Sequence, residues 1–262
     1  MTHAAEGAPC GMDVAVAGGG AWTDPAARCL RPGGLRLTER VVELACLPPR
    51  GRVLDVGCGA GATVAHLVHD LGLRASGIDA SPAQVARARE ARPDLDVVVG
   101  RAESLPFEDE AFDAVLAECV LSTLSDAHAA LGEMTRVLAR GGRLLVTDVY
   151  TRGGSDVRPP AGLPSLGREE VVKALLGAAG LVVETWEDHT GALARLFWDM
   201  ARRGGTSDDA RKTRRAAPPG RPGRAGRRLG YFVCVARLDA LAGRAKGAAD
   251  AGHRPSCAAT RP

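Results

Sequence analysis

Aromatic residues are scarce in this sequence, at 3% of its 262 residues, so a core must be packed mostly by Ala, Val and Leu. No run of about 18 uncharged apolar residues occurs, which argues against a membrane-spanning helix. The first residues also lack the basic and then apolar pattern of a signal peptide. We therefore expect a cytoplasmic protein with one domain and appendages.

Cysteine pairs of the kind that bind zinc are absent as well. The seven cysteines form no C-x-x-C pair and no Cys/His cluster, which argues against both a metal site and a disulfide framework. An odd number of scattered thiols fits a reducing compartment. We expect no bound metal.

The net charge of +3 is unevenly distributed along the chain. Residues 201–228 carry ten Lys or Arg and two Asp, a net +8, so the remainder carries −5. This segment is also rich in Pro and Gly, and we expect a disordered basic loop at about 204–228. RNA binding is an alternative, but no aromatic residues are interleaved, so we favour simple solvated charge over a nucleic-acid site.

The remaining composition divides the chain into a central domain with flexible ends. Residues 1–20 are rich in Ala and Gly and are expected to form a mobile arm. The domain spans 21–238 and begins with a helical preface that is broken by Pro48 and Pro49. Residues 239–262 are expected to form a disordered tail.

Strand and helix patterns alternate through the central domain, which predicts an α/β fold with a mostly parallel sheet and helices on both faces. Predicted strands lie at 53–56, 73–78, 95–99, 112–117, 143–148, from 181 and at 231–236. Predicted helices follow the first strand, begin at Ser81, and span 126–139 and 168–179. Ser81 and Pro82 provide an N-cap and a first helical residue, and Gly141–Gly142 is expected to end the helix before the fifth strand.

The most informative stretch is residues 52–63, which read as a buried strand, a glycine turn and the start of a helix. Gly57, Gly59 and Gly61 allow a sharp turn and the close approach of a ligand to bare backbone. The first N–H groups of the helix point back at this turn. These features predict a nucleotide-type site in which Cys58 needs no redox role.

Asp55 helps to identify the nucleotide. The glycine spacing, with Asp79 about 20 residues later, also fits the dinucleotide fingerprint. A carboxylate at the end of the strand would, however, repel a pyrophosphate and attract an ammonium group. Asp55 therefore disfavours an NAD-dependent oxidoreductase, which stays only as an alternative.

Four motifs in this order resemble class I S-adenosylmethionine-dependent methyltransferases. They are VLDVGCGAG at 53–61, GID at 77–79, RAESLPF at 101–107 followed by Phe112 and Asp113, and RVLARGG at 136–142. The chain is most similar to the small-molecule branch with the ubiquinone and menaquinone enzymes, and partly to arsenite methyltransferases. The resemblance implies a Rossmann-like, doubly wound α/β/α sandwich with seven strands, of which the last is antiparallel.

The resemblance also implies S-adenosylmethionine as cofactor and assigns residues to it. Asp79 would accept both ribose hydroxyls, and Ile78 and Ala80 would flank the adenine. Arg101 departs from the acidic residue usual in the family, which questions the contact to the adenine amine. The implied cofactor-binding residues are Asp55, Gly57, Cys58, Gly59, Gly61, Asp79, Ala80, Ala102, Glu103, Glu118 and Cys119.

Methyl transfer from a sulfonium is an in-line displacement, so the protein mainly aligns the acceptor and excludes water, and a general base is optional. The catalytic candidates are Cys119, His189 and His128, each with a purely structural alternative. Segments 22–24 and 31–38 are possible lids, and Trp186 and Trp198 are possible cavity-lining or core residues.

We therefore predict methyl transfer from S-adenosylmethionine to a small molecule. The alternatives are an RNA methyltransferase, an arsenite or thiol methyltransferase, an NAD-dependent oxidoreductase and a non-catalytic cofactor-binding protein. The arsenite alternative lacks the further cysteines it needs, because none occurs between Val120 and Val233.

Overall fold

The computed structural model describes residues 31–153, 165–203 and 229–239. The expected arm at 1–20, the segment 22–24, the basic loop and the tail beyond Asp239 lie outside these residues. The elements are α1 (Leu35–Ala45), β1 (Arg52–Val56), α2 (Ala62–His69), β2 (Arg74–Asp79), α3 (Pro82–Ala91), β3 (Asp96–Val99), β4 (Phe112–Glu118), η1 (Leu121–Thr123), α4 (Ala127–Val137), β5 (Leu138–Thr151), α5 (Glu169–Ala178), β6 (Leu181–Asp188), α6 (Thr190–Arg203) and β7 (Leu229–Leu238).

The seven strands form one sheet in the order β3-β2-β1-β4-β5-β7-β6. The pairs from β3 to β5 are all parallel, whereas β7 runs antiparallel to both β5 and β6. This confirms the predicted seven-stranded sheet with an antiparallel last strand. The strand order reverses between β1 and β4, and ligands of such sheets bind beyond the carboxyl ends of the strands at this switch point.

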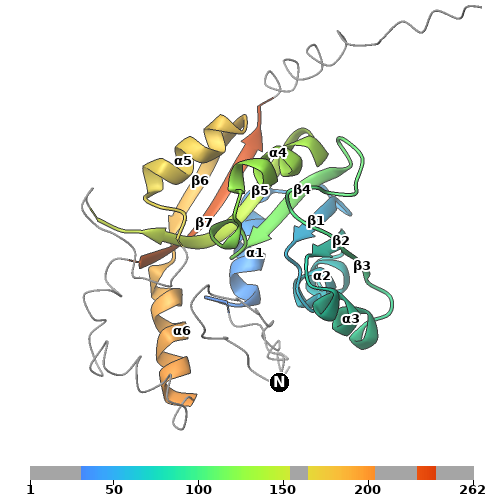
Figure 1. Ribbon diagram of the computed structural model, residues 1–262, viewed down its shortest axis with the longest axis horizontal. Coiled ribbons are helices and arrows are strands. Elements are labelled where there is room, and N and C mark those ends of the chain that lie inside the picture. Colours follow the sequence, from blue (N-terminus) through green and yellow to red (C-terminus); the bar gives the residue numbers. More distant parts are fainter. Residues whose placement is uncertain (1–30, 154–164, 204–228, 240–262) are drawn as a thin grey trace, which may run out of the picture.

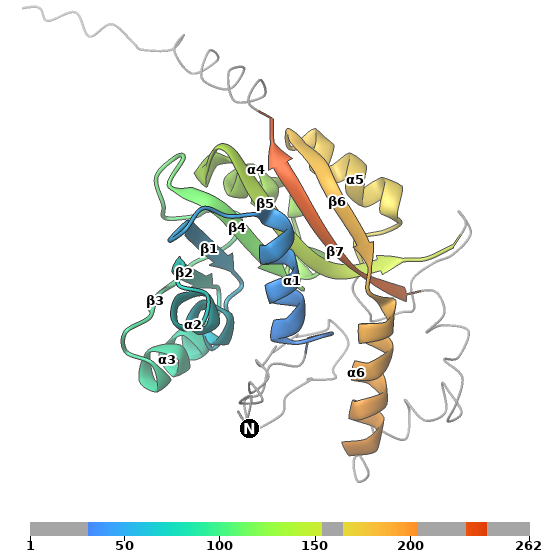
Figure 2. The ribbon, with the colours of Figure 1, turned by 180° about the vertical axis from the view of Figure 1, so that it is seen from behind.

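Helices cover both faces of the sheet, as expected for an α/β/α sandwich (Figures 1 and 2). One layer contains α1, α2, α3 and α6, and the other contains α4 and α5. The alternation of side chains along β4 shows why both layers are needed: Ala114 and Leu116 belong to the first core cluster, whereas Val115 and Ala117 belong to the second. A strand that is apolar on both faces is stable only between two layers.

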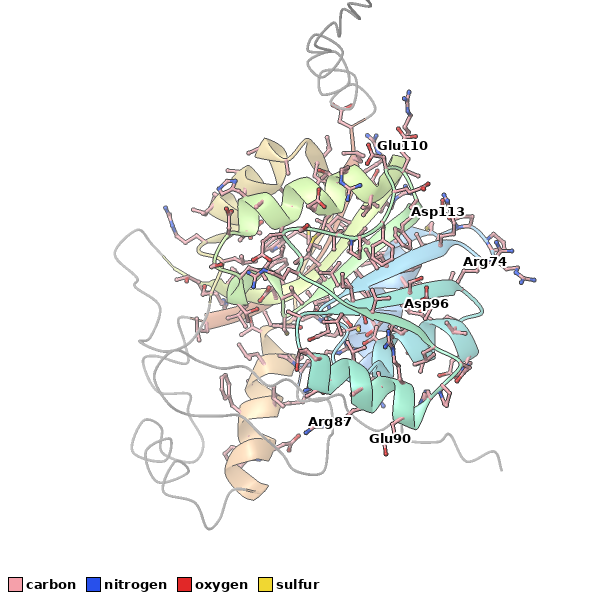
Figure 3. The ribbon with its side chains drawn as sticks, turned by 45° about the vertical axis from the view of Figure 1, so that its right-hand side comes forward. Arg74, Arg87, Glu90, Asp96, Glu110 and Asp113 are labelled. Carbon is pink, nitrogen blue, oxygen red and sulfur yellow. The ribbon has the colours of Figure 1, made fainter. Side chains whose placement is uncertain are left out.

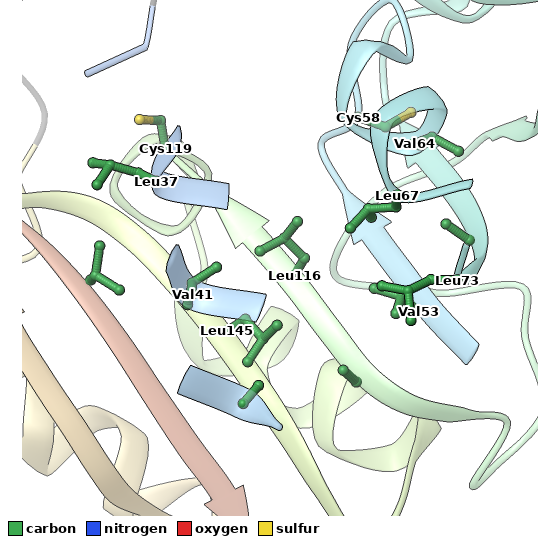
Figure 4. Packing of buried hydrophobic residues seen from close by; sticks show 14 of the residues in the cluster. Leu37, Val41, Val53, Cys58, Val64, Leu67, Leu73, Leu116, Cys119 and Leu145 are labelled. Atoms are coloured by element: carbon green, nitrogen blue, oxygen red, sulfur yellow. The ribbon is translucent and has the colours of Figure 1, made fainter. Parts of the chain in front are cut away.

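Helix α1 packs over the middle of the sheet in the first layer. Its residues Leu37 and Val41 lie over Leu116 of β4 and Leu145 of β5, and Cys119 lies beside Leu37 (Figure 4). These α1 residues are spaced by one helical turn, which places them on one face of the helix. The segment before the first strand thus reaches the carboxyl end of β4.

The predicted boundary between the fourth helix and the fifth strand was wrong. Helix α4 ends at Val137 rather than at Ala139, and β5 already begins at Leu138. The reason is tertiary: Leu138 pairs with Phe112 of β4, which draws the backbone out of the helix. The turn occurs inside the strand at Gly141, which has a φ of 71°.

Candidate functional site

The glycine turn between β1 and α2 lies at the switch point of the sheet. Gly57, Gly59 and Gly61 have φ values of 75°, 53° and 76°, a region that L-residues rarely adopt. A Cβ on Gly57 would lie 2.4 Å from Cγ2 of Val120. The turn is held against β2 because the N–H groups of Gly57 and Cys58 donate to the Ile78 carbonyl, at 2.7 and 3.0 Å.

Asp79 ends β2 beside this turn. Its Oδ2 accepts from the Gly59 N–H at 2.8 Å, and its Oδ1 accepts from the Ser81 N–H at 2.8 Å. The Ser81 hydroxyl accepts from the Gln84 N–H, which confirms the predicted N-cap of α3. Each carboxylate oxygen has a further lone pair, so the fixed Asp79 can still accept from a ligand hydroxyl.

Asp55 is buried at the carboxyl end of β1, with 3% of its surface exposed. Its Oδ2 accepts no hydrogen bond from the described residues. Burial raises the pKa of this carboxyl well above its ordinary value, the negative charge of Glu118 raises it further, and Arg31 opposes both. An unsatisfied buried carboxyl oxygen beside a glycine turn fits a ligand that brings a hydrogen-bond donor or a cation.

Glu118 ends β4 and binds a buried arginine. The Arg31 guanidinium donates to Glu118 and to the Thr63 hydroxyl of α2, the latter at 2.8 Å. The Thr38 hydroxyl of α1 donates to Glu118 Oε1 at 3.1 Å. Burial raises the pKa of Glu118, and the Arg31 charge is the largest opposing cause.

Cys119 follows Glu118 in a strained backbone conformation, with a φ of 56°. Its Sγ lies 3.0 Å from the Tyr231 hydroxyl, which lies 2.8 Å from the Thr147 hydroxyl. Burial, and then the charge of Asp148, raise the pKa of the thiol far above its ordinary value. Burial therefore favours the neutral form of the Cys119 thiol.

Asp148 is a buried acid that the sequence interpretation did not assign to the site. It is fully buried at the carboxyl end of β5, where Oδ2 accepts from the Ser122 N–H at 3.0 Å and Oδ1 from the Val149 N–H at 2.7 Å. Burial raises its pKa to about 6, against the hydrogen bonds from Ser122 and Val149. Asp148 thus fixes the 3₁₀ turn η1 that follows Cys119. An acidic residue directly after a buried strand was the signal available in the sequence.

His189 lies at the carboxyl end of β6 with its imidazole oriented by an acid. Its Nε2 lies 2.9 Å from Glu187 Oε2, and Arg40 of α1 donates to Glu187 Oε1 at 2.6 Å. Hydrogen bonds from Arg40 and then from His189 lower the pKa of Glu187 to about 2. The His189 N–H donates to the Tyr231 carbonyl, so His189 adjoins the strand that carries the Cys119 partner.

The other histidines lie elsewhere. His128 is exposed in the first turn of α4, and the structure does not bring it together with Cys119. His66 of α2 is buried, with 8% exposure. Its Nδ1 lies 2.6 Å from Asp70 Oδ2, one turn further along α2.

The residues expected around adenine lie at the carboxyl end of β2 and in the segment that follows β3. Ile78 and Ala102 are buried, and a Cβ on Gly100 would lie 2.7 Å from Cδ1 of Ile78, so the wall is tightly packed. The exposed Arg101 pairs with Glu103 at 3.2 Å. Arg101, which departs from the family pattern, therefore forms an ion pair with Glu103 of the same motif.

The two tryptophans of the described chain differ in burial. Trp186 stacks on Phe232 at a centroid distance of 4.1 Å, within the core cluster under α5. Trp198 of α6 is 46% exposed. Trp186 therefore has a core role rather than one at the glycine turn.

A surface hollow of about 770 Å³ lies at the opposite end of the parallel strands. It is lined by Arg50, Arg52 and Arg74 together with Asp94 and Asp96. Figure 3 shows Arg74 pointing outward from this end of the sheet. Because its acidic and basic side chains offset one another and the glycine turn is remote, this hollow is not the candidate site.

Three carboxylates therefore surround the glycine turn: Asp55, Asp79 and Glu118. A pyrophosphate would be repelled by this set, whereas a ligand with an ammonium, a sulfonium and hydroxyl donors would be attracted. Among the described residues, no group of three His, Cys, Asp or Glu side chains could hold a metal ion.

Comparison with known proteins points to one family. Residues 54–146 match the family model described as a methyltransferase domain. The chain is 44% identical over 103 residues to a demethylmenaquinone methyltransferase of Beutenbergia cavernae, covering 39% of this chain and 42% of the relative. It is 35% identical over 202 residues to the 27-O-demethylrifamycin SV methyltransferase of Amycolatopsis mediterranei, covering 70% and 72%.

Solved structures extend the likeness to most of the chain. The [4+2]-cyclase SpnF has a TM-score of 0.66 and 29% identity, covering 78% of this chain and 81% of that chain. A geranyl diphosphate C-methyltransferase from Streptomyces coelicolor, in complex with S-adenosyl-L-homocysteine, has a TM-score of 0.65 and 18% identity, covering 78% and 77%. The chain spans about half the length of several curated relatives it matches. None of the helices in the described part of the chain is long and apolar enough to cross a membrane.

Proposed function

The chain belongs to the class I S-adenosylmethionine-dependent methyltransferases, and from that premise we propose that it methylates a small molecule. The observation that carries the proposal is Asp55, whose buried Oδ2 lies unsatisfied beside the glycine turn. Gly57 next to it has no side chain, because a Cβ there would lie 2.4 Å from Cγ2 of Val120, and its backbone therefore stays bare. Both features fit the cofactor, which when bound supplies a methyl group on a positively charged sulfur.

The residues that would hold the cofactor come from four strand ends. Asp79 would accept from the ribose hydroxyls, because its two oxygens are already fixed by backbone N–H groups. Asp55 and Glu118 would bind the ammonium group and favour the sulfonium electrostatically. The remaining cofactor contacts are assigned to Gly57, Cys58, Gly59, Gly61, Ala80, Ala102, Glu103 and Cys119.

The acceptor would lie beyond the carboxyl ends of β4 and β5. The buried Cys119 and Val120 would form an apolar wall there and exclude water from the reacting atoms. The relatives support a small-molecule acceptor, since two of them are named as methyltransferases of demethylmenaquinone and of 27-O-demethylrifamycin SV. They do not support the RNA alternative.

His189 is the better oriented of the two candidate bases. A base must be held so that one nitrogen faces the proton it accepts. Glu187 fixes one imidazole nitrogen of His189, and Arg40 fixes Glu187. We assign His189 the removal of the acceptor proton and give His128, on the exposed side of α4, no role.

A second candidate function has one observation in its favour. The similarity to SpnF, which is named as a [4+2]-cyclase, is as close in TM-score as the similarity to a methyltransferase. The same fold could then bind the cofactor without transferring its methyl group. Turnover of the methyl-labelled cofactor separates the two functions, because a cyclase leaves the label in place.

Cofactor choice is tested first by calorimetry of the full chain with S-adenosylhomocysteine and with NADH. We expect binding of the former and none of the latter, because three carboxylates would repel a pyrophosphate. Binding of NADH alone would contradict the proposal. Labelled S-adenosylmethionine is then incubated with extracts depleted of macromolecules, and a labelled small product is expected.

We also propose that the protein acts in the cytoplasm. Cys46, Cys119 and Cys234 are thiols rather than disulfides in the described part of the chain. Persistent thiols are typical of reducing compartments. Fractionation of the producing cell tests this proposal, and recovery outside the cytoplasm contradicts it.

A further inference from the structure

A buried histidine lies between the first two helices. His66 belongs to α2, one turn after Thr63, and its side chain is buried. Its Nδ1 lies 2.6 Å from Oδ2 of Asp70 on the same helix. Its Nε2 lies 3.1 Å from Oε1 of Glu39, which belongs to α1. The imidazole therefore faces one carboxylate at each of its two nitrogens.

Only the charged form of this imidazole suits both carboxylates. An ionised carboxylate can only accept, so Nδ1 must donate to Asp70, and in a neutral ring the lone pair of Nε2 would then face Glu39. With a second proton, Nε2 attracts Glu39 instead of repelling it. Nε2 is buried and has no hydrogen-bond partner of regular geometry among the described residues, so its contact with Glu39 depends on charge. The proton on Nε2 therefore links α1 to α2.

This contact lies close to the candidate site on both helices. Thr38, the neighbour of Glu39 in α1, donates to Oε1 of Glu118 at 3.1 Å. The Thr63 hydroxyl of α2 lies 3.4 Å from Oε2 of the same carboxylate. Burial raises the pKa of Glu118, and the charge of His66 is among the causes that oppose the rise. A looser contact between α1 and α2 would therefore disturb the residues beside the glycine turn.

We infer that protonation of His66 holds α1 against α2 and that cofactor binding is coupled to this proton. The inference rests on the proposed function and adds a pH-dependent step to it. When the ring is neutral, α1 is held less firmly, and a smaller fraction of the protein has Thr38 against Glu118. The apparent affinity for the cofactor falls in proportion to that fraction. His66 is then a positioning residue, because it acts through α1.

The other ionisable groups near the site predict the opposite pH dependence. Burial raises the pKa values of Asp55 and Glu118, and these acids would attract the ammonium of the cofactor only when they are ionised. Their titration therefore strengthens binding as the pH rises, whereas that of His66 weakens it. The charged groups at this junction of α1, α2 and β4 are Glu39, Asp70, Glu118 and Arg31.

Calorimetry of the full chain with S-adenosylhomocysteine measures the coupling. Titrations at about pH 5.5 and about pH 8 give the affinity on either side of the range in which histidine changes charge. Titrations at about pH 7 in two buffers of different ionisation enthalpy give the number of protons taken up on binding. The wild type is compared with His66→Gln, which stays polar and cannot titrate. His69→Gln is the matched control, because His69 lies on the same helix and pairs with Asp94 at 2.7 Å.

We expect the affinity of the wild type to fall about 3- to 10-fold more than that of His66→Gln between the lower and the higher pH. Binding to the wild type should take up part of a proton that His66→Gln does not take up. His69→Gln should behave like the wild type in both measurements. Retained binding of S-adenosylhomocysteine at the lower pH also shows that a variant is folded.

A second pair of variants tests the partner on α1. Glu39→Gln removes the carboxylate that Nε2 faces, so it should abolish most of the difference from His66→Gln. Glu43→Gln, an exposed acid one turn further along α1, should leave the wild-type behaviour intact.

Two results separate this inference from the proposed function. Equal pH profiles and equal proton uptake in the wild type, His66→Gln and Glu39→Gln overturn the coupling, while the proposed function stands. Failure of the wild type to bind S-adenosylhomocysteine at any pH overturns the proposed function and this inference with it.

Discussion

The Tyr231 hydroxyl lies 3.0 Å from the Cys119 sulfur, although 112 residues separate the two in the chain. Tyr231 is fully buried, and its hydroxyl also contacts the Thr147 hydroxyl at 2.8 Å. One phenol therefore joins the ends of three strands, β4, β5 and β7. It supports the strained backbone at Cys119, where we place the acceptor.

Tyr231→Phe should destabilise the protein by about 1–3 kcal/mol, because it leaves the buried Thr147 hydroxyl without this partner. Tyr150→Phe is the matched control. Its hydroxyl donates to Asp188, whose side chain is 42% exposed, so water can replace the lost bond and the cost should stay below about 1 kcal/mol. Urea unfolding of both variants measures the difference. Equal losses would show that the buried network adds no stability.

Gly57→Ala should be more destabilising than Gly72→Ala. Both residues have positive φ, 75° and 65°, so both substitutions incur a backbone cost of about 1–2 kcal/mol. Only Gly57 faces a neighbour, since its Cβ would lie 2.4 Å from Val120 while nothing lies within 4 Å at Gly72. Unfolding midpoints and calorimetry with S-adenosylhomocysteine should show a larger loss for Gly57→Ala. Val120→Ala should rescue part of it; equal effects at the two glycines would contradict the steric account.

Local signals explain which parts of the structure were predictable. The glycine turn and the Ser81 N-cap depend on residues close in sequence, and both lie where predicted. The contact of Arg31 with Glu118 spans 87 residues and that of Cys119 with Tyr231 spans 112, so periodicity and spacing could not reveal them.

The wrong boundary at the end of α4 has the same origin. Helical spacing continues through Leu138, yet the pairing of Leu138 with Phe112 in the sheet prevails over that local preference. A tertiary contact therefore decides where the helix ends.

Asp148 should make the protein less stable as the pH rises from about 4 to about 6. Its pKa of about 6 in the folded protein exceeds the ordinary 3.8, so the folded state binds the proton more tightly and loses that advantage as the acid ionises. Two pKa units correspond to about 3 kcal/mol. Asp148→Asn cannot ionise and should lack this part of the pH dependence.

Urea unfolding of wild type and Asp148→Asn at pH 4.5 and 7.0 measures this difference. Asp55 and Glu118 also have raised pKa values and act in the same direction, so the comparison between the two proteins isolates Asp148. Parallel pH profiles would show that Asp148 ionises with an ordinary pKa.

Results

Sequence analysis

Aromatic residues are scarce in this sequence, at 3% of its 262 residues, so a core must be packed mostly by Ala, Val and Leu. No run of about 18 uncharged apolar residues occurs, which argues against a membrane-spanning helix. The first residues also lack the basic and then apolar pattern of a signal peptide. We therefore expect a cytoplasmic protein with one domain and appendages.

Cysteine pairs of the kind that bind zinc are absent as well. The seven cysteines form no C-x-x-C pair and no Cys/His cluster, which argues against both a metal site and a disulfide framework. An odd number of scattered thiols fits a reducing compartment. We expect no bound metal.

The net charge of +3 is unevenly distributed along the chain. Residues 201–228 carry ten Lys or Arg and two Asp, a net +8, so the remainder carries −5. This segment is also rich in Pro and Gly, and we expect a disordered basic loop at about 204–228. RNA binding is an alternative, but no aromatic residues are interleaved, so we favour simple solvated charge over a nucleic-acid site.

The remaining composition divides the chain into a central domain with flexible ends. Residues 1–20 are rich in Ala and Gly and are expected to form a mobile arm. The domain spans 21–238 and begins with a helical preface that is broken by Pro48 and Pro49. Residues 239–262 are expected to form a disordered tail.

Strand and helix patterns alternate through the central domain, which predicts an α/β fold with a mostly parallel sheet and helices on both faces. Predicted strands lie at 53–56, 73–78, 95–99, 112–117, 143–148, from 181 and at 231–236. Predicted helices follow the first strand, begin at Ser81, and span 126–139 and 168–179. Ser81 and Pro82 provide an N-cap and a first helical residue, and Gly141 and Gly142 are expected to end the helix before the fifth strand.

The most informative stretch is residues 52–63, which read as a buried strand, a glycine turn and the start of a helix. Gly57, Gly59 and Gly61 allow a sharp turn and the close approach of a ligand to bare backbone. The first N–H groups of the helix point back at this turn. These features predict a nucleotide-type site in which Cys58 needs no redox role.

Asp55 helps to identify the nucleotide. The glycine spacing, with Asp79 about 20 residues later, also fits the dinucleotide fingerprint. A carboxylate at the end of the strand would, however, repel a pyrophosphate and attract an ammonium group. Asp55 therefore disfavours an NAD-dependent oxidoreductase, which stays only as an alternative.

Four motifs in this order resemble class I S-adenosylmethionine-dependent methyltransferases. They are VLDVGCGAG at 53–61, GID at 77–79, RAESLPF at 101–107 followed by Phe112 and Asp113, and RVLARGG at 136–142. The chain is most similar to the small-molecule branch with the ubiquinone and menaquinone enzymes, and partly to arsenite methyltransferases. The resemblance implies a Rossmann-like, doubly wound α/β/α sandwich with seven strands, of which the last is antiparallel.

The resemblance also implies S-adenosylmethionine as cofactor and assigns residues to it. Asp79 would accept from both ribose hydroxyls, and Ile78 and Ala80 would flank the adenine. At the position of Arg101 the family usually has an acidic residue, which can accept a hydrogen bond from the adenine amine. Arg101 departs from this pattern. The implied cofactor-binding residues are Asp55, Gly57, Cys58, Gly59, Gly61, Asp79, Ala80, Ala102, Glu103, Glu118 and Cys119.

Methyl transfer from a sulfonium is an in-line displacement, so the protein mainly aligns the acceptor and excludes water, and a general base is optional. The catalytic candidates are Cys119, His189 and His128, each with a purely structural alternative. Segments 22–24 and 31–38 are candidate lids. Trp186 and Trp198 are candidates for lining a cavity or for filling the core.

We therefore predict methyl transfer from S-adenosylmethionine to a small molecule. The alternatives are an RNA methyltransferase, an arsenite or thiol methyltransferase, an NAD-dependent oxidoreductase and a non-catalytic cofactor-binding protein. The arsenite alternative lacks the further cysteines it needs, because none occurs between Val120 and Val233.

Overall fold

The computed structural model describes residues 31–153, 165–203 and 229–239. The expected arm at 1–20, the segment 22–24, the basic loop and the tail beyond Asp239 lie outside these residues. The elements are α1 (Leu35–Ala45), β1 (Arg52–Val56), α2 (Ala62–His69), β2 (Arg74–Asp79), α3 (Pro82–Ala91), β3 (Asp96–Val99), β4 (Phe112–Glu118), η1 (Leu121–Thr123), α4 (Ala127–Val137), β5 (Leu138–Thr151), α5 (Glu169–Ala178), β6 (Leu181–Asp188), α6 (Thr190–Arg203) and β7 (Leu229–Leu238).

The seven strands form one sheet in the order β3-β2-β1-β4-β5-β7-β6. The pairs from β3 to β5 are all parallel, whereas β7 runs antiparallel to both β5 and β6. This confirms the predicted seven-stranded sheet with an antiparallel last strand. The strand order reverses between β1 and β4, and ligands of such sheets bind beyond the carboxyl ends of the strands at this switch point.

Helices cover both faces of the sheet, as expected for an α/β/α sandwich (Figures 1 and 2). One layer contains α1, α2, α3 and α6, and the other contains α4 and α5. The side chains of β4 show why both layers are needed, because Ala114 and Leu116 belong to the first core cluster and Val115 and Ala117 to the second. A strand that is apolar on both faces is buried only between two layers.

Helix α1 packs over the middle of the sheet in the first layer. Its residues Leu37 and Val41 lie over Leu116 of β4 and Leu145 of β5, and Cys119 lies beside Leu37 (Figure 4). The two α1 residues are spaced by one helical turn, which places them on one face of the helix. The segment before the first strand thus reaches the carboxyl end of β4.

The predicted boundary between the fourth helix and the fifth strand was wrong. Helix α4 ends at Val137 rather than at Ala139, and β5 already begins at Leu138. The reason is tertiary, because Leu138 pairs with Phe112 of β4 and the backbone therefore leaves the helix. The expected glycine turn occurs inside the strand, where Gly141 has a φ of 71°.

Candidate functional site

The glycine turn between β1 and α2 lies at the switch point of the sheet. Gly57, Gly59 and Gly61 have φ values of 75°, 53° and 76°, a region that L-residues rarely adopt. A Cβ on Gly57 would lie 2.4 Å from Cγ2 of Val120. The turn is held against β2 because the N–H groups at 57 and 58 donate to the Ile78 carbonyl, at 2.7 and 3.0 Å.

Asp79 ends β2 beside this turn. Its Oδ2 accepts from the Gly59 N–H at 2.8 Å, and its Oδ1 accepts from the Ser81 N–H at 2.8 Å. The Ser81 hydroxyl accepts from the Gln84 N–H, which confirms the predicted N-cap of α3. Each carboxylate oxygen has a further lone pair, so the fixed Asp79 can still accept from a ligand hydroxyl.

Asp55 is buried at the carboxyl end of β1, with 3% of its surface exposed. Its Oδ2 accepts no hydrogen bond from the described residues. Burial raises the pKa of this carboxyl well above its ordinary value, the negative charge of Glu118 raises it further, and Arg31 opposes both. An unsatisfied buried carboxyl oxygen beside a glycine turn fits a ligand that brings a hydrogen-bond donor or a cation.

Glu118 ends β4 next to this turn and binds a buried arginine. The Arg31 guanidinium donates to Glu118 and to the Thr63 hydroxyl of α2, the latter at 2.8 Å. The Thr38 hydroxyl of α1 donates to Glu118 Oε1 at 3.1 Å. Burial raises the pKa of Glu118, and the Arg31 charge is the largest opposing cause.

Cys119 follows Glu118 in a strained backbone conformation, with a φ of 56°. Its Sγ lies 3.0 Å from the Tyr231 hydroxyl, which lies 2.8 Å from the Thr147 hydroxyl. Burial, and then the charge of Asp148, raise the pKa of the thiol far above its ordinary value. Burial therefore favours the neutral form of the Cys119 thiol.

Asp148 is a buried acid that the sequence interpretation did not assign to the site. It is fully buried at the carboxyl end of β5, where Oδ2 accepts from the Ser122 N–H at 3.0 Å and Oδ1 from the Val149 N–H at 2.7 Å. Burial raises its pKa to about 6, against the opposing hydrogen bonds from Ser122 and Val149. Asp148 thus fixes the 3₁₀ turn η1 that follows Cys119. An acidic residue directly after an apolar strand was the signal available in the sequence.

His189 lies at the carboxyl end of β6 with its imidazole oriented by an acid. Its Nε2 lies 2.9 Å from Glu187 Oε2, and Arg40 of α1 donates to Glu187 Oε1 at 2.6 Å. Hydrogen bonds from Arg40 and then from His189 lower the pKa of Glu187 to about 2. The His189 N–H donates to the Tyr231 carbonyl, so His189 adjoins the strand that carries the partner of Cys119.

The other histidines lie elsewhere. His128 is exposed in the first turn of α4, and the structure does not bring it together with Cys119. His66 of α2 is buried, with 8% exposure. Its Nδ1 lies 2.6 Å from Asp70 Oδ2, one turn further along α2.

The residues expected around adenine lie at the carboxyl end of β2 and in the segment that follows β3. Ile78 and Ala102 are buried, and a Cβ on Gly100 would lie 2.7 Å from Cδ1 of Ile78, so the wall is tightly packed. The exposed Arg101 pairs with Glu103 at 3.2 Å. Arg101, which departs from the family pattern, therefore forms an ion pair with Glu103 of the same motif.

Two tryptophans in the described part of the chain differ in burial. Trp186 stacks on Phe232 at a centroid distance of 4.1 Å, beside the core cluster under α5. Trp198 of α6 is 46% exposed. Trp186 therefore has a core role rather than one at the glycine turn.

A surface hollow of about 770 Å³ lies at the opposite end of the parallel strands. It is lined in part by Arg50, Arg52 and Arg74 together with Asp94 and Asp96. Figure 3 shows Arg74 pointing outward from this end of the sheet. Because its acidic and basic side chains offset one another and the glycine turn is remote, this hollow is not the candidate site.

Three carboxylates therefore surround the glycine turn: Asp55, Asp79 and Glu118. A pyrophosphate would be repelled by this set, whereas a ligand with an ammonium, a sulfonium and hydroxyl donors would be attracted. Among the described residues, no group of three His, Cys, Asp or Glu side chains could hold a metal ion.

Comparison with known proteins points to one family. Residues 54–146 match the family model described as a methyltransferase domain. The chain is 44% identical over 103 residues to a demethylmenaquinone methyltransferase of Beutenbergia cavernae, covering 39% of this chain and 42% of the relative. It is 35% identical over 202 residues to the 27-O-demethylrifamycin SV methyltransferase of Amycolatopsis mediterranei, covering 70% and 72%.

Solved structures extend the likeness to most of the chain. The [4+2]-cyclase SpnF has a TM-score of 0.66 and 29% identity, covering 78% of this chain and 81% of that chain. A geranyl diphosphate C-methyltransferase from Streptomyces coelicolor, in complex with S-adenosyl-L-homocysteine, has a TM-score of 0.65 and 18% identity, covering 78% and 77%. The chain spans about half the length of several curated relatives it matches. None of the helices in the described part of the chain is long and apolar enough to cross a membrane.

Proposed function

The chain belongs to the class I S-adenosylmethionine-dependent methyltransferases, and from that premise we propose that it methylates a small molecule. The observation that carries the proposal is Asp55, whose buried Oδ2 lies unsatisfied beside the glycine turn. Gly57 next to it has no side chain, because a Cβ there would lie 2.4 Å from Cγ2 of Val120, and its backbone therefore stays bare. Both features fit the cofactor, which when bound supplies a methyl group on a positively charged sulfur.

The residues that would hold the cofactor come from four strand ends. Asp79 would accept from the ribose hydroxyls, because its two oxygens are already fixed by backbone N–H groups. Asp55 and Glu118 would bind the ammonium group and favour the sulfonium electrostatically. The remaining cofactor contacts are assigned to Gly57, Cys58, Gly59, Gly61, Ala80, Ala102, Glu103 and Cys119.

The acceptor would lie beyond the carboxyl ends of β4 and β5. The buried Cys119 and Val120 would form an apolar wall there and exclude water from the reacting atoms. The relatives support a small-molecule acceptor, since two of them are named as methyltransferases of demethylmenaquinone and of 27-O-demethylrifamycin SV. They do not support the RNA alternative.

His189 is the better oriented of the two candidate bases. A base must be held so that one nitrogen faces the proton it accepts. Glu187 fixes one imidazole nitrogen of His189, and Arg40 fixes Glu187. We assign His189 the removal of the acceptor proton and give His128, on the exposed side of α4, no role.

A second candidate function has one observation in its favour. The similarity to SpnF, which is named as a [4+2]-cyclase, is as close in TM-score as the similarity to a methyltransferase. The same fold could then bind the cofactor without transferring its methyl group. Turnover of the methyl-labelled cofactor separates the two functions, because a cyclase leaves the label in place.

Cofactor choice is tested first, by calorimetry of the full chain with S-adenosylhomocysteine and with NADH. We expect binding of the former and none of the latter, because three carboxylates would repel a pyrophosphate. Binding of NADH alone would contradict the proposal. Labelled S-adenosylmethionine is then incubated with cell extract depleted of macromolecules, and a labelled small product is expected.

We also propose that the protein acts in the cytoplasm. Cys46, Cys119 and Cys234 are thiols rather than disulfides in the described part of the chain. Persistent thiols are typical of reducing compartments. Fractionation of the producing cell tests this proposal, and recovery outside the cytoplasm contradicts it.

A further inference from the structure

A buried histidine lies between the first two helices. His66 belongs to α2, one turn after Thr63, and its side chain is buried. Its Nδ1 lies 2.6 Å from Oδ2 of Asp70 on the same helix. Its Nε2 lies 3.1 Å from Oε1 of Glu39, which belongs to α1. The imidazole therefore faces one carboxylate at each of its two nitrogens.

Only the charged form of this imidazole suits both carboxylates. An ionised carboxylate can only accept, so Nδ1 must donate to Asp70, and in a neutral ring the lone pair of Nε2 would then face Glu39. With a second proton, Nε2 attracts Glu39 instead of repelling it. Nε2 is buried and has no hydrogen-bond partner of regular geometry among the described residues, so its contact with Glu39 depends on charge. The proton on Nε2 therefore links α1 to α2.

This contact lies close to the candidate site on both helices. Thr38, the neighbour of Glu39 in α1, donates to Oε1 of Glu118 at 3.1 Å. The Thr63 hydroxyl of α2 lies 3.4 Å from Oε2 of the same carboxylate. Burial raises the pKa of Glu118, and the charge of His66 is among the causes that oppose the rise. A looser contact between α1 and α2 would therefore disturb the residues beside the glycine turn.

We infer that protonation of His66 holds α1 against α2 and that cofactor binding is coupled to this proton. The inference rests on the proposed function and adds a pH-dependent step to it. When the ring is neutral, α1 is held less firmly, and a smaller fraction of the protein has Thr38 against Glu118. The apparent affinity for the cofactor falls in proportion to that fraction. His66 is then a positioning residue, because it acts through α1.

The other ionisable groups near the site predict the opposite pH dependence. Burial raises the pKa values of Asp55 and Glu118, and these acids would attract the ammonium of the cofactor only when they are ionised. Their titration therefore strengthens binding as the pH rises, whereas that of His66 weakens it. The charged groups at this junction of α1, α2 and β4 are Glu39, Asp70, Glu118 and Arg31.

Calorimetry of the full chain with S-adenosylhomocysteine measures the coupling. Titrations at about pH 5.5 and about pH 8 give the affinity on either side of the range in which histidine changes charge. Titrations at about pH 7 in two buffers of different ionisation enthalpy give the number of protons taken up on binding. The wild type is compared with His66→Gln, which stays polar and cannot titrate. His69→Gln is the matched control, because His69 lies on the same helix and pairs with Asp94 at 2.7 Å.

We expect the affinity of the wild type to fall about 3- to 10-fold more than that of His66→Gln between the lower and the higher pH. Binding to the wild type should take up part of a proton that His66→Gln does not take up. His69→Gln should behave like the wild type in both measurements. Retained binding of S-adenosylhomocysteine at the lower pH also shows that a variant is folded.

A second pair of variants tests the partner on α1. Glu39→Gln removes the carboxylate that Nε2 faces, so it should abolish most of the difference from His66→Gln. Glu43→Gln, an exposed acid one turn further along α1, should leave the wild-type behaviour intact.

Two results separate this inference from the proposed function. Equal pH profiles and equal proton uptake in the wild type, His66→Gln and Glu39→Gln overturn the coupling, while the proposed function stands. Failure of the wild type to bind S-adenosylhomocysteine at any pH overturns the proposed function and this inference with it.

Discussion

The Tyr231 hydroxyl lies 3.0 Å from the Cys119 sulfur, although 112 residues separate the two in the chain. Tyr231 is fully buried, and its hydroxyl also contacts the Thr147 hydroxyl at 2.8 Å. One phenol therefore joins the ends of three strands, β4, β5 and β7. It supports the strained backbone at Cys119, where we place the acceptor.

Tyr231→Phe should destabilise the protein by about 1–3 kcal/mol, because it leaves the buried Thr147 hydroxyl without this partner. Tyr150→Phe is the matched control. Its hydroxyl donates to Asp188, whose side chain is 42% exposed, so water can replace the lost bond and the cost should stay below about 1 kcal/mol. Urea unfolding of both variants measures the difference, and equal losses would show that the buried network adds no stability.

Gly57→Ala should be more destabilising than Gly72→Ala. Both residues have positive φ, 75° and 65°, so both substitutions incur a backbone cost of about 1–2 kcal/mol. Only Gly57 faces a neighbour, since its Cβ would lie 2.4 Å from Val120 while nothing lies within 4 Å at Gly72. Unfolding midpoints and calorimetry with S-adenosylhomocysteine should show the larger loss for Gly57→Ala.

Val120→Ala provides the test of the steric explanation for Gly57. It removes the methyl group that the new Cβ would meet, so it should restore part of the stability and affinity that Gly57→Ala loses. Equal effects at Gly57 and Gly72, without rescue, would contradict the explanation.

Local signals explain which parts of the structure were predictable. The glycine turn and the Ser81 N-cap depend on residues close in sequence, and both lie where predicted. The contact of Arg31 with Glu118 spans 87 residues and that of Cys119 with Tyr231 spans 112, so periodicity and spacing could not reveal them.

The wrong boundary at the end of α4 has the same origin. Helical spacing continues through Leu138, yet the pairing of Leu138 with Phe112 in the sheet prevails over that local preference. A tertiary contact therefore decides where the helix ends.

Asp148 should make the protein less stable as the pH rises from about 4 to about 6. Its pKa of about 6 in the folded protein exceeds the ordinary 3.8, so the folded state binds the proton more tightly and loses that advantage as the acid ionises. Two pKa units correspond to about 3 kcal/mol. Asp148→Asn cannot ionise and should lack this part of the pH dependence.

Urea unfolding of wild type and Asp148→Asn at about pH 4.5 and about pH 7 measures this contribution. Asp55 and Glu118 also have raised pKa values and act in the same direction, so the comparison between the two proteins isolates Asp148. Parallel pH profiles would show that Asp148 ionises with an ordinary pKa.

His189→Ala should lower kcat by about 10²- to 10⁴-fold if His189 removes the acceptor proton, with little change in cofactor affinity. Glu187→Gln should lower kcat by a smaller factor, because it loosens the orientation of the imidazole without removing it. Glu184→Gln is the control, since Glu184 lies on the same strand and binds Arg143 and Arg237 instead.

Steady-state kinetics, once an acceptor is in hand, separates these effects from a structural one. Loss of kcat with unchanged binding of S-adenosylhomocysteine supports the base. A His189→Ala variant with normal kcat would show that the reaction needs no base from this position.

Asp79→Ala should weaken S-adenosylhomocysteine by about 1.5–3 kcal/mol, because a charge-assisted contact to the ribose hydroxyls is lost from a partly buried site. Asp96→Ala is the control, since Asp96 is an exposed acid at the opposite end of the neighbouring strand β3.

A ligand without the 2′-hydroxyl sharpens the test. The wild type should bind this ligand more weakly than it binds S-adenosylhomocysteine. The Asp79→Ala variant should bind the two ligands with nearly equal affinity. If the missing hydroxyl weakens binding equally in both proteins, Asp79 does not contact it, and the position of the ribose relative to β2 must be assigned differently.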